Sequence, residues 1–171
     1  TSNVFSDYQR EINEIFAESG LLYTLTTAKI VERILEHSPL TSKVETVIHS
    51  VKEKGLKDLL EEAVTLFKQP DPASRNDAME KLWDAFERMK TYYTTLDKKK
   101  SAARIVTDMS GGRTEFAKLF EDEFKALTDI GNGFRIRHHE TDKIDITDSR
   151  HFDYIFNRCM SLIASALQYL N

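Results

Sequence analysis

Residues 72–94 carry the most regular helical repeat of apolar side chains in the chain, and this repeat constrains the fold more than any other feature. The repeat consists of Met79, Leu82, Trp83, Phe86, Met89 and Tyr93. Positions three and four apart share one face of an α-helix, so the spacing predicts a long helix with one buried face. Asp71 suits the N-cap of this helix, and Pro72 suits its first position, where no backbone N–H is needed.

The same period predicts helices along most of the remaining chain. These helices are expected over residues 3–19, 41–51, 56–68, 97–109, 114–130 and 149–170. Ser6 with Gln9, and Ser42 with Glu45, have the spacing of capping boxes, which begin helices. We expect glycines to end helices, and they lie at positions 20, 55, 111, 112, 131 and 133. The stretch after the last glycine, residues 134–146, is expected to be irregular or extended.

Residues 21–35 differ from the rest because they are rich in β-branched side chains. They are expected to form a short β-hairpin with its turn near residues 27–28. Six glycines and three prolines are too few for an all-β protein. The sequence therefore predicts a mainly α fold, a bundle of about six to seven helices, with a possible hairpin near residues 21–35.

A chain of 171 residues is expected to form one domain. Within it, residues 1–35 form an N-terminal helix with the hairpin, and residues 40–171 form the bundle. The chain begins at Thr1 without a methionine and stops directly after an apolar helix, so we expect a fragment of a longer chain, although removal of the methionine would explain the first observation.

Composition narrows the class of protein. The net charge of −4 argues against a broad surface that coats nucleic acid, but it leaves room for one basic cleft. Cys159 is the only cysteine, so no internal disulfide forms, and its apolar neighbours indicate a small buried side chain rather than a reactive thiol. There is no signal peptide and no apolar run of about 18 residues, so we expect a cytoplasmic protein without a membrane span.

Basic and titratable side chains gather in the sequence FRIRHHE at residues 134–140. In an extended strand Arg135, Arg137 and His139 share one face, and in a helix Arg135 and His139 still meet. Guanidinium groups bind phosphate oxygens, and a histidine can exchange a proton with a ribose hydroxyl near neutral pH. The cluster is thus suited to phosphodiester cleavage without a metal or another cofactor.

The candidate residues follow from this chemistry, and two alternatives stay open. Arg135, Arg137, His138 and His139 are the candidate catalytic residues, and Asn132, Arg135, Arg137, Glu140 and Lys143 are the candidate substrate-binding residues. The first alternative is that the arginines and the glutamate are ion-paired scaffold. The second is a metal site drawn from His138, His139, Glu140, Asp142, His151 and Asp153, which lacks the usual ligand spacing.

The sequence LTDIGNGFRIRHHETDK at residues 127–143, with FNRC at 156–159 and KLWDAFER at 81–88, resembles bacterial abortive-infection (AbiJ-type) proteins. Over residues 40–171 the chain resembles the HEPN-like domain of these defence proteins. The resemblance implies a helical bundle and a homodimer that cleaves RNA without metal, with an arginine and a histidine of each subunit at a shared cleft.

In the HEPN motif four to six residues separate the arginine from the histidine, whereas three separate Arg135 from His139. By resemblance, Arg135 or Arg137 would bind phosphate and His139 would be the acid or base, with His138 as substitute. Non-catalytic HEPN domains also occur. Two functions are therefore expected: a dimeric ribonuclease of phage defence that acts on RNA, or a non-catalytic dimerisation, regulatory or RNA-binding module whose effector or sensor domain lies outside this chain.

Overall fold

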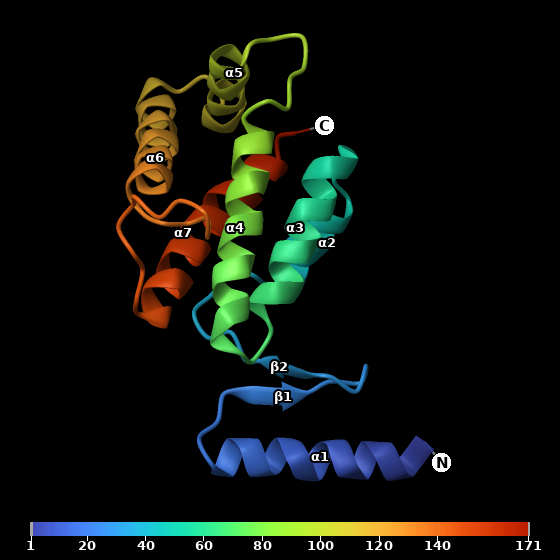
Figure 1. Ribbon diagram of the computed structural model, residues 1–171. Coiled ribbons are helices and arrows are strands. Elements are labelled where there is room, and N and C mark those ends of the chain that lie inside the picture. Colours follow the sequence, from blue (N-terminus) through green and yellow to red (C-terminus); the bar gives the residue numbers. More distant parts are fainter. Residues whose placement is uncertain (1, 171) are drawn as a thin grey trace.

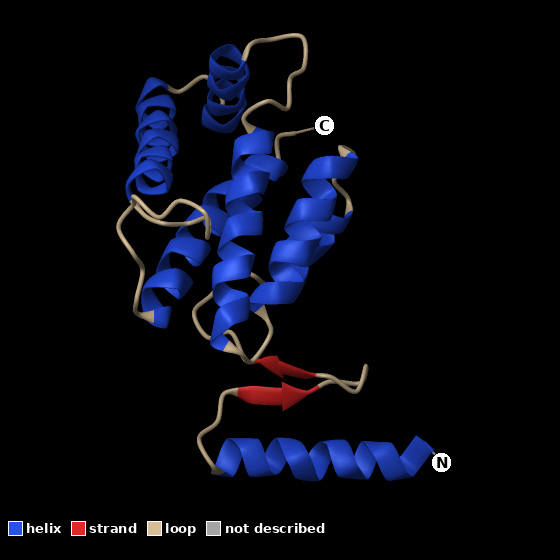
Figure 2. Ribbon diagram, viewed as in Figure 1, coloured by secondary structure: helices blue, strands red, loops and turns tan. Residues whose placement is uncertain are grey.

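The computed structural model describes residues 2–170 and confirms a mainly helical fold with one antiparallel hairpin (Figures 1 and 2). In chain order the elements are α1 (Ser2–Glu18), β1 (Tyr23–Leu25), β2 (Val31–Arg33), α2 (Ser42–His49), α3 (Lys54–Phe67), α4 (Pro72–Met89), α5 (Lys98–Ser110), α6 (Thr114–Gly133) and α7 (Ser149–Leu167). Within the described range, no helix is both long enough and apolar enough to span a membrane.

Helix α4 lies at the centre of the bundle, where it packs against α3 and α7 (Figure 1). It begins as the sequence predicts, because the Asp71 side chain accepts a hydrogen bond from the Ser74 N–H at 3.0 Å and Pro72 opens the first turn. The helical repeat is buried from Met79 to Met89, which confirms the core interpretation. The helix ends at Met89, before Tyr93, whose hydroxyl instead donates to Asp108 at 2.7 Å.

The hairpin forms within the predicted range, with Leu25 opposite Val31 and the turn between them. Helix α1 packs on the hairpin, and Figure 1 shows the two strands between α1 and the bundle. The amides of Gln9 and Asn13 donate to the Leu25 carbonyl at 2.9 and 3.1 Å. Ser6 lies inside α1 rather than at its start, so the capping box predicted there is wrong.

Two expected helix boundaries also differ at α2 and α3. The N-cap of α2 is Thr41 rather than Ser42, and its hydroxyl accepts from the Val44 N–H. Gly55 lies in the first turn of α3 instead of ending the preceding helix. A Cβ atom at Gly55 would lie 2.2 Å from the guanidinium carbon of Arg88, so this glycine leaves room for the Arg88 side chain, which pairs with Glu53.

Helix α6 continues through Gly133, whereas the sequence predicted that residues 131–133 would stop it. Packing explains why residue 131 is a glycine: a Cβ atom there would lie 2.1 Å from the indole Nε1 of the buried Trp83. Gly131 therefore makes room for the Trp83 side chain of α4 against α6. By contrast, Gly111 ends α5 as predicted, in the left-handed conformation at φ 58°.

Cys159 is fully buried in α7, in agreement with the interpretation as a small apolar side chain. Burial raises the pKa of its thiol well above the ordinary range. The thiol therefore stays protonated and unreactive at neutral pH. The neighbouring core is aromatic, since the rings of Phe67 and Phe156 stack with their centroids 3.7 Å apart.

Candidate functional site

The connection between α6 and α7, residues 134–148, contains all four candidate catalytic residues. It folds back on itself, because the Arg135 N–H donates to the Ile144 carbonyl at 2.8 Å and the Ile144 N–H donates to the Gly133 carbonyl at 3.0 Å. Ile136 is fully buried and anchors the connection in the core. The segment is thus a compact loop, neither a helix nor a regular strand.

The Arg135 guanidinium links two parts of this loop through hydrogen bonds. Its Nη2 and Nε donate to the His138 carbonyl at 2.6 and 3.1 Å, and its Nη1 donates to the Asp145 carboxylate at 3.1 Å. The side chain is 33 % exposed and that of Asp145 is 65 % exposed, so the ion pair lies at the surface. Arg135 therefore stabilises the turn that carries His138.

Arg137 points to a different partner, on α4. Its Nη2 and Nε donate to the same oxygen of Asp84 at 2.7 and 3.2 Å, and its Nη1 lies 3.6 Å from Glu140. Burial acts to lower the pKa of Arg137, but the Asp84 bond and the charges of Asp84 and Glu140 outweigh burial and raise it. This guanidinium is firmly charged and is paired within the chain.

Glu140 and Lys143 form a second pair in the same loop. The Lys143 ammonium lies 2.8 Å from Glu140 and also donates to the Gly131 carbonyl at 2.8 Å. The bond from Lys143 is the main reason that the pKa of Glu140 is lowered. Lys143 therefore joins the loop to the end of α6, and both candidate substrate-binding residues have structural partners.

The two histidines and Asn132 are exposed. The His138 ring Nε2 lies 2.9 Å from Asp77 of α4, and its backbone N–H donates to Glu80 at 3.4 Å. Asn132 lies in the last turn of α6 rather than in a loop. His139 is exposed in the same turn as His138.

The observed geometry corrects the expectation that Arg135, Arg137 and His139 share one face, or that Arg135 and His139 meet on a helix. The turn at residues 137–139 instead sends Arg135 to Asp145 and Arg137 to Asp84. A sequence signal for the α4 partner existed: Asp77, Glu80 and Asp84 have helical spacing and form an acidic face along the core helix.

The alternative metal site is not assembled in the described part of the chain. Among residues 2–170, no group of three or more His, Cys, Asp or Glu side chains is placed to hold an ion. His151 is exposed, and Asp153 instead lies beside Arg33 and Arg75. Sequence reasoning missed this last group, because its members come from three separate elements with no local pattern.

Comparisons with protein-family models, with curated proteins and with solved structures found no significant match for this chain.

Proposed function

We propose that the chain is a non-catalytic helical module of an abortive-infection defence protein, which self-associates and regulates an effector or sensor domain. The carrying observation is that both arginines of the α6–α7 connection already bind acceptors of the chain. Arg137 makes two bonds to Asp84, and Arg135 bonds the His138 carbonyl and Asp145. A phosphate would have to displace these acceptors before either guanidinium could bind it through two parallel hydrogen bonds.

The acidic surroundings of the loop support the same proposal. Asp77, Glu80 and Asp84 line the face of α4 beneath the connection, and Asp145 lies on its other side. An approaching RNA backbone would meet these carboxylates together with the arginines. Like charges close together repel, so the local field does not favour phosphate.

Exposed apolar side chains on residues 2–35, the N-terminal unit formed by α1 and the hairpin, support self-association. Within the described residues, Val4, Tyr8, Ile15, Leu21, Leu22, Ile30 and Ile34 are large, apolar and exposed. Seven large apolar side chains exposed within residues 4–34 are more than scattered surface residues require, and exposed apolar surface is typical of protein interfaces. The occupant we propose is a second copy of the chain, in line with the dimer that the HEPN resemblance implies.

The nuclease test incubates purified protein with mixed RNA in excess chelator. We expect no cleavage by folded wild type, and no difference between wild type, Arg135→Ala and His139→Ala. Cleavage by wild type that both substitutions abolish would overturn the non-catalytic proposal.

The assembly test measures sedimentation velocity. We expect a wild-type dimer that Ile15→Lys converts to a monomer. Leu119→Lys on α6 is the matched control, because Leu119 is 55 % exposed and Ile15 is 54 % exposed. A monomeric wild type, or a dimer that only Leu119→Lys dissociates, would contradict self-association through the N-terminal unit.

A second candidate function is metal-independent RNA cleavage by a dimer. The observation that favours it is the exposure of His138 and His139 next to Arg135, which is itself one-third exposed. In a dimer, the histidine of one subunit could act beside an arginine of its partner. The nuclease test above separates this candidate from the first.

A further inference from the structure

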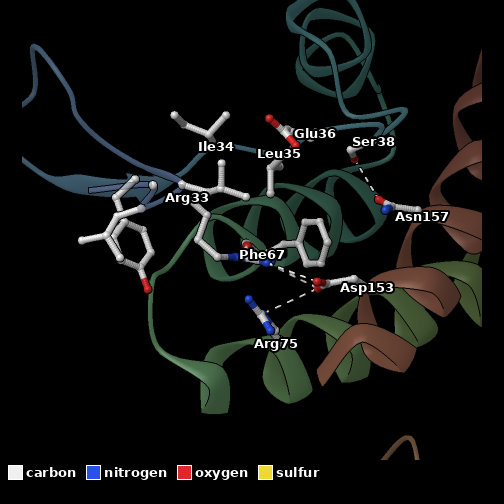
Figure 3. Close-up of a pocket in the computed structure, with 13 residues that line it drawn as sticks. Arg33, Ile34, Leu35, Glu36, Ser38, Phe67, Arg75, Asp153 and Asn157 are labelled. Atoms are coloured by element: carbon white, nitrogen blue, oxygen red, sulfur yellow. Dashed lines mark hydrogen bonds and ion pairs between the residues drawn. The ribbon is translucent and has the colours of Figure 1, made fainter. Parts of the chain in front are cut away.

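A cavity of about 360 Å³ lies where the N-terminal unit meets the bundle (Figure 3). Its walls come from β1 and the segment before it, from β2 and the residues after it, from the end of α3, from the first turn of α4 and from the first half of α7. It shares no residue with the α6–α7 connection. An inference drawn from it therefore stands apart from the proposed function.

Arg33 of β2 forms the buried floor of this cavity. Its Nη2 and Nε donate to the Phe67 carbonyl at the end of α3, at 2.6 and 3.0 Å, and its guanidinium lies over the Phe67 ring. The remaining nitrogen, Nη1, lies 3.4 Å from both oxygens of Asp153. With 9 % of its side chain exposed, Arg33 is a charge held in place at the junction.

Arg75 of α4 approaches the same carboxylate from the other side. Its Nε lies 3.6 Å from Asp153, which is within ion-pair range but too long for a hydrogen bond. That Nε is buried and has no hydrogen-bond partner among residues 2–170. Figure 3 shows both guanidinium groups directed toward Asp153. A buried donor without an acceptor is costly, so Asp153 does not fully compensate the Arg75 guanidinium, whose side chain is 18 % exposed and lines the cavity.

The charges around Asp153 do not balance. Arg33 and Arg75 carry two positive charges, and Asp153 supplies one negative charge at distances of 3.4 and 3.6 Å. Burial is the main cause that lowers the pKa of Arg33, and the charge of Arg75 lowers it further, while Asp153 opposes both. Glu36, the other carboxylate that lines the cavity, is exposed and forms no ion pair with Arg33 or Arg75 among residues 2–170, so one further negative charge beside the two arginines would complete the group.

The other lining residues favour a ligand that is larger and more apolar than a simple ion. Leu21, Leu22, Ile34 and Leu35 supply apolar surface, and Tyr23 supplies aromatic surface. A volume of about 360 Å³ falls at the lower end of the range for sites that hold small organic molecules. We propose that this cavity binds an organic monoanion, a carboxylate attached to an apolar body, with the carboxylate on Arg75 and the body against the leucines.

A second polar contact lies at the opposite wall. The Ser38 hydroxyl donates to the Asn157 Oδ1 at 2.8 Å, which holds the Asn157 amide at the edge of the cavity (Figure 3). The amide nitrogen of Asn157 is then a donor for a polar group at the far end of a ligand. The site thus combines a charged end, an apolar middle and a neutral polar rim.

The test uses 4-phenylbutyrate as the probe and the whole chain as the protein, followed by amide chemical shifts in an NMR titration. We expect saturable shifts confined to residues 20–38, 67, 75 and 153–157. The neutral isostere 4-phenylbutanol is expected to bind at least about tenfold more weakly, since it loses the charge-assisted bond. Equal binding of the alcohol, or shifts that lie elsewhere, would overturn the proposal.

Arg75→Met is the decisive variant, because it removes the charge but retains most of the apolar length. We expect it to weaken 4-phenylbutyrate binding about tenfold while the amide spectrum stays that of a folded protein. Arg113→Met, at an exposed site before α6, is the matched control and should bind like wild type. Unchanged binding by Arg75→Met would refute the proposal that Arg75 binds the carboxylate. Inorganic phosphate that binds as tightly as 4-phenylbutyrate would refute the proposal that the ligand has an apolar body.

Discussion

The α6–α7 connection and the Arg33–Arg75 cavity both contain two arginines, but they distribute counter-charge differently. In the connection, Arg135 has Asp145 and Arg137 has Asp84. In the cavity, Arg33 and Arg75 share the single carboxylate of Asp153. The region with the higher density of charge along the sequence is therefore the one whose charges are paired.

The comparison shows that a dense run of charge along a chain does not by itself make charge available to a ligand. A loop rich in basic residues needs acceptors in order to fold, and α4 and the loop itself supply them. The cavity assembles its arginines from distant segments, and the unsatisfied Nε of Arg75 remains. Substitutions at four places test this contrast and the helix end that carries the connection, and they follow in order of decreasing effect.

The largest effect is expected at Asp153. Asp153→Asn leaves two mostly buried guanidinium groups without a counter-charge and should lower the free energy of unfolding by about 3 kcal/mol in urea denaturation. The matched change Asp145→Asn removes an exposed partner and should cost less than about 0.5 kcal/mol. Equal losses at the two sites would erase the distinction between the regions.

The second effect is steric and concerns the end of α6, which positions the connection. Gly131→Ala places a Cβ atom against the buried Trp83 and should destabilise the protein by about 2 kcal/mol. Gly133→Ala, in the same turn of helix, meets nothing within 4 Å and should be neutral or slightly stabilising. Thermal unfolding of both variants measures the difference, and a neutral Gly131→Ala would disprove the close contact of the Trp83 side chain with Gly131.

The third effect is at Arg137. Arg137→Met removes both bonds to Asp84 and the ion pair with Glu140, and should lower the free energy of unfolding by about 1 kcal/mol. Arg135→Met should cost about half as much, because its acceptors are more exposed. If neither variant lost stability, the arginines would not be scaffold and the ribonuclease candidate would gain support.

The smallest effect depends on pH and concerns Glu140. The bond from Lys143 lowers the pKa of Glu140 in the folded state below its ordinary value of 4.5, so the carboxylate stabilises the fold above pH 4.5. This contribution is lost as the pH falls through the folded-state pKa. Glu140→Gln should therefore cost about 0.5 kcal/mol at pH 7 and progressively less below pH 4.5. A difference that grows in acid would contradict the assignment.

The sequence predicted those features that depend on neighbouring residues. Asp71 and Pro72 begin α4, the apolar repeat of α4 is buried, and residues 21–35 form the hairpin. These predictions succeeded because capping, periodicity and β-branched composition act over a few residues. The candidate cluster was also located correctly as a loop between two core helices, although its chemistry stays a prediction.

The predictions that failed depended on residues far away in the chain. Gly131 looked like a helix stop, yet it is a contact with Trp83, and Gly55 makes room for Arg88. Arg135 and Arg137 do not share a face, because Arg137 pairs with Asp84 on α4. No pattern within a few residues carries such information.

By itself, the sequence determined the helical class, the start of the central helix, the hairpin and the position of the basic cluster, since hydrophobic period and capping chemistry are local. The tertiary structure alone decided which charges are paired. It joined Arg137 to Asp84 and brought Arg33, Arg75 and Asp153 to one cavity. The physical reason is that the energy of a charge depends on its burial and on the distance to its partners, which only the folded chain defines.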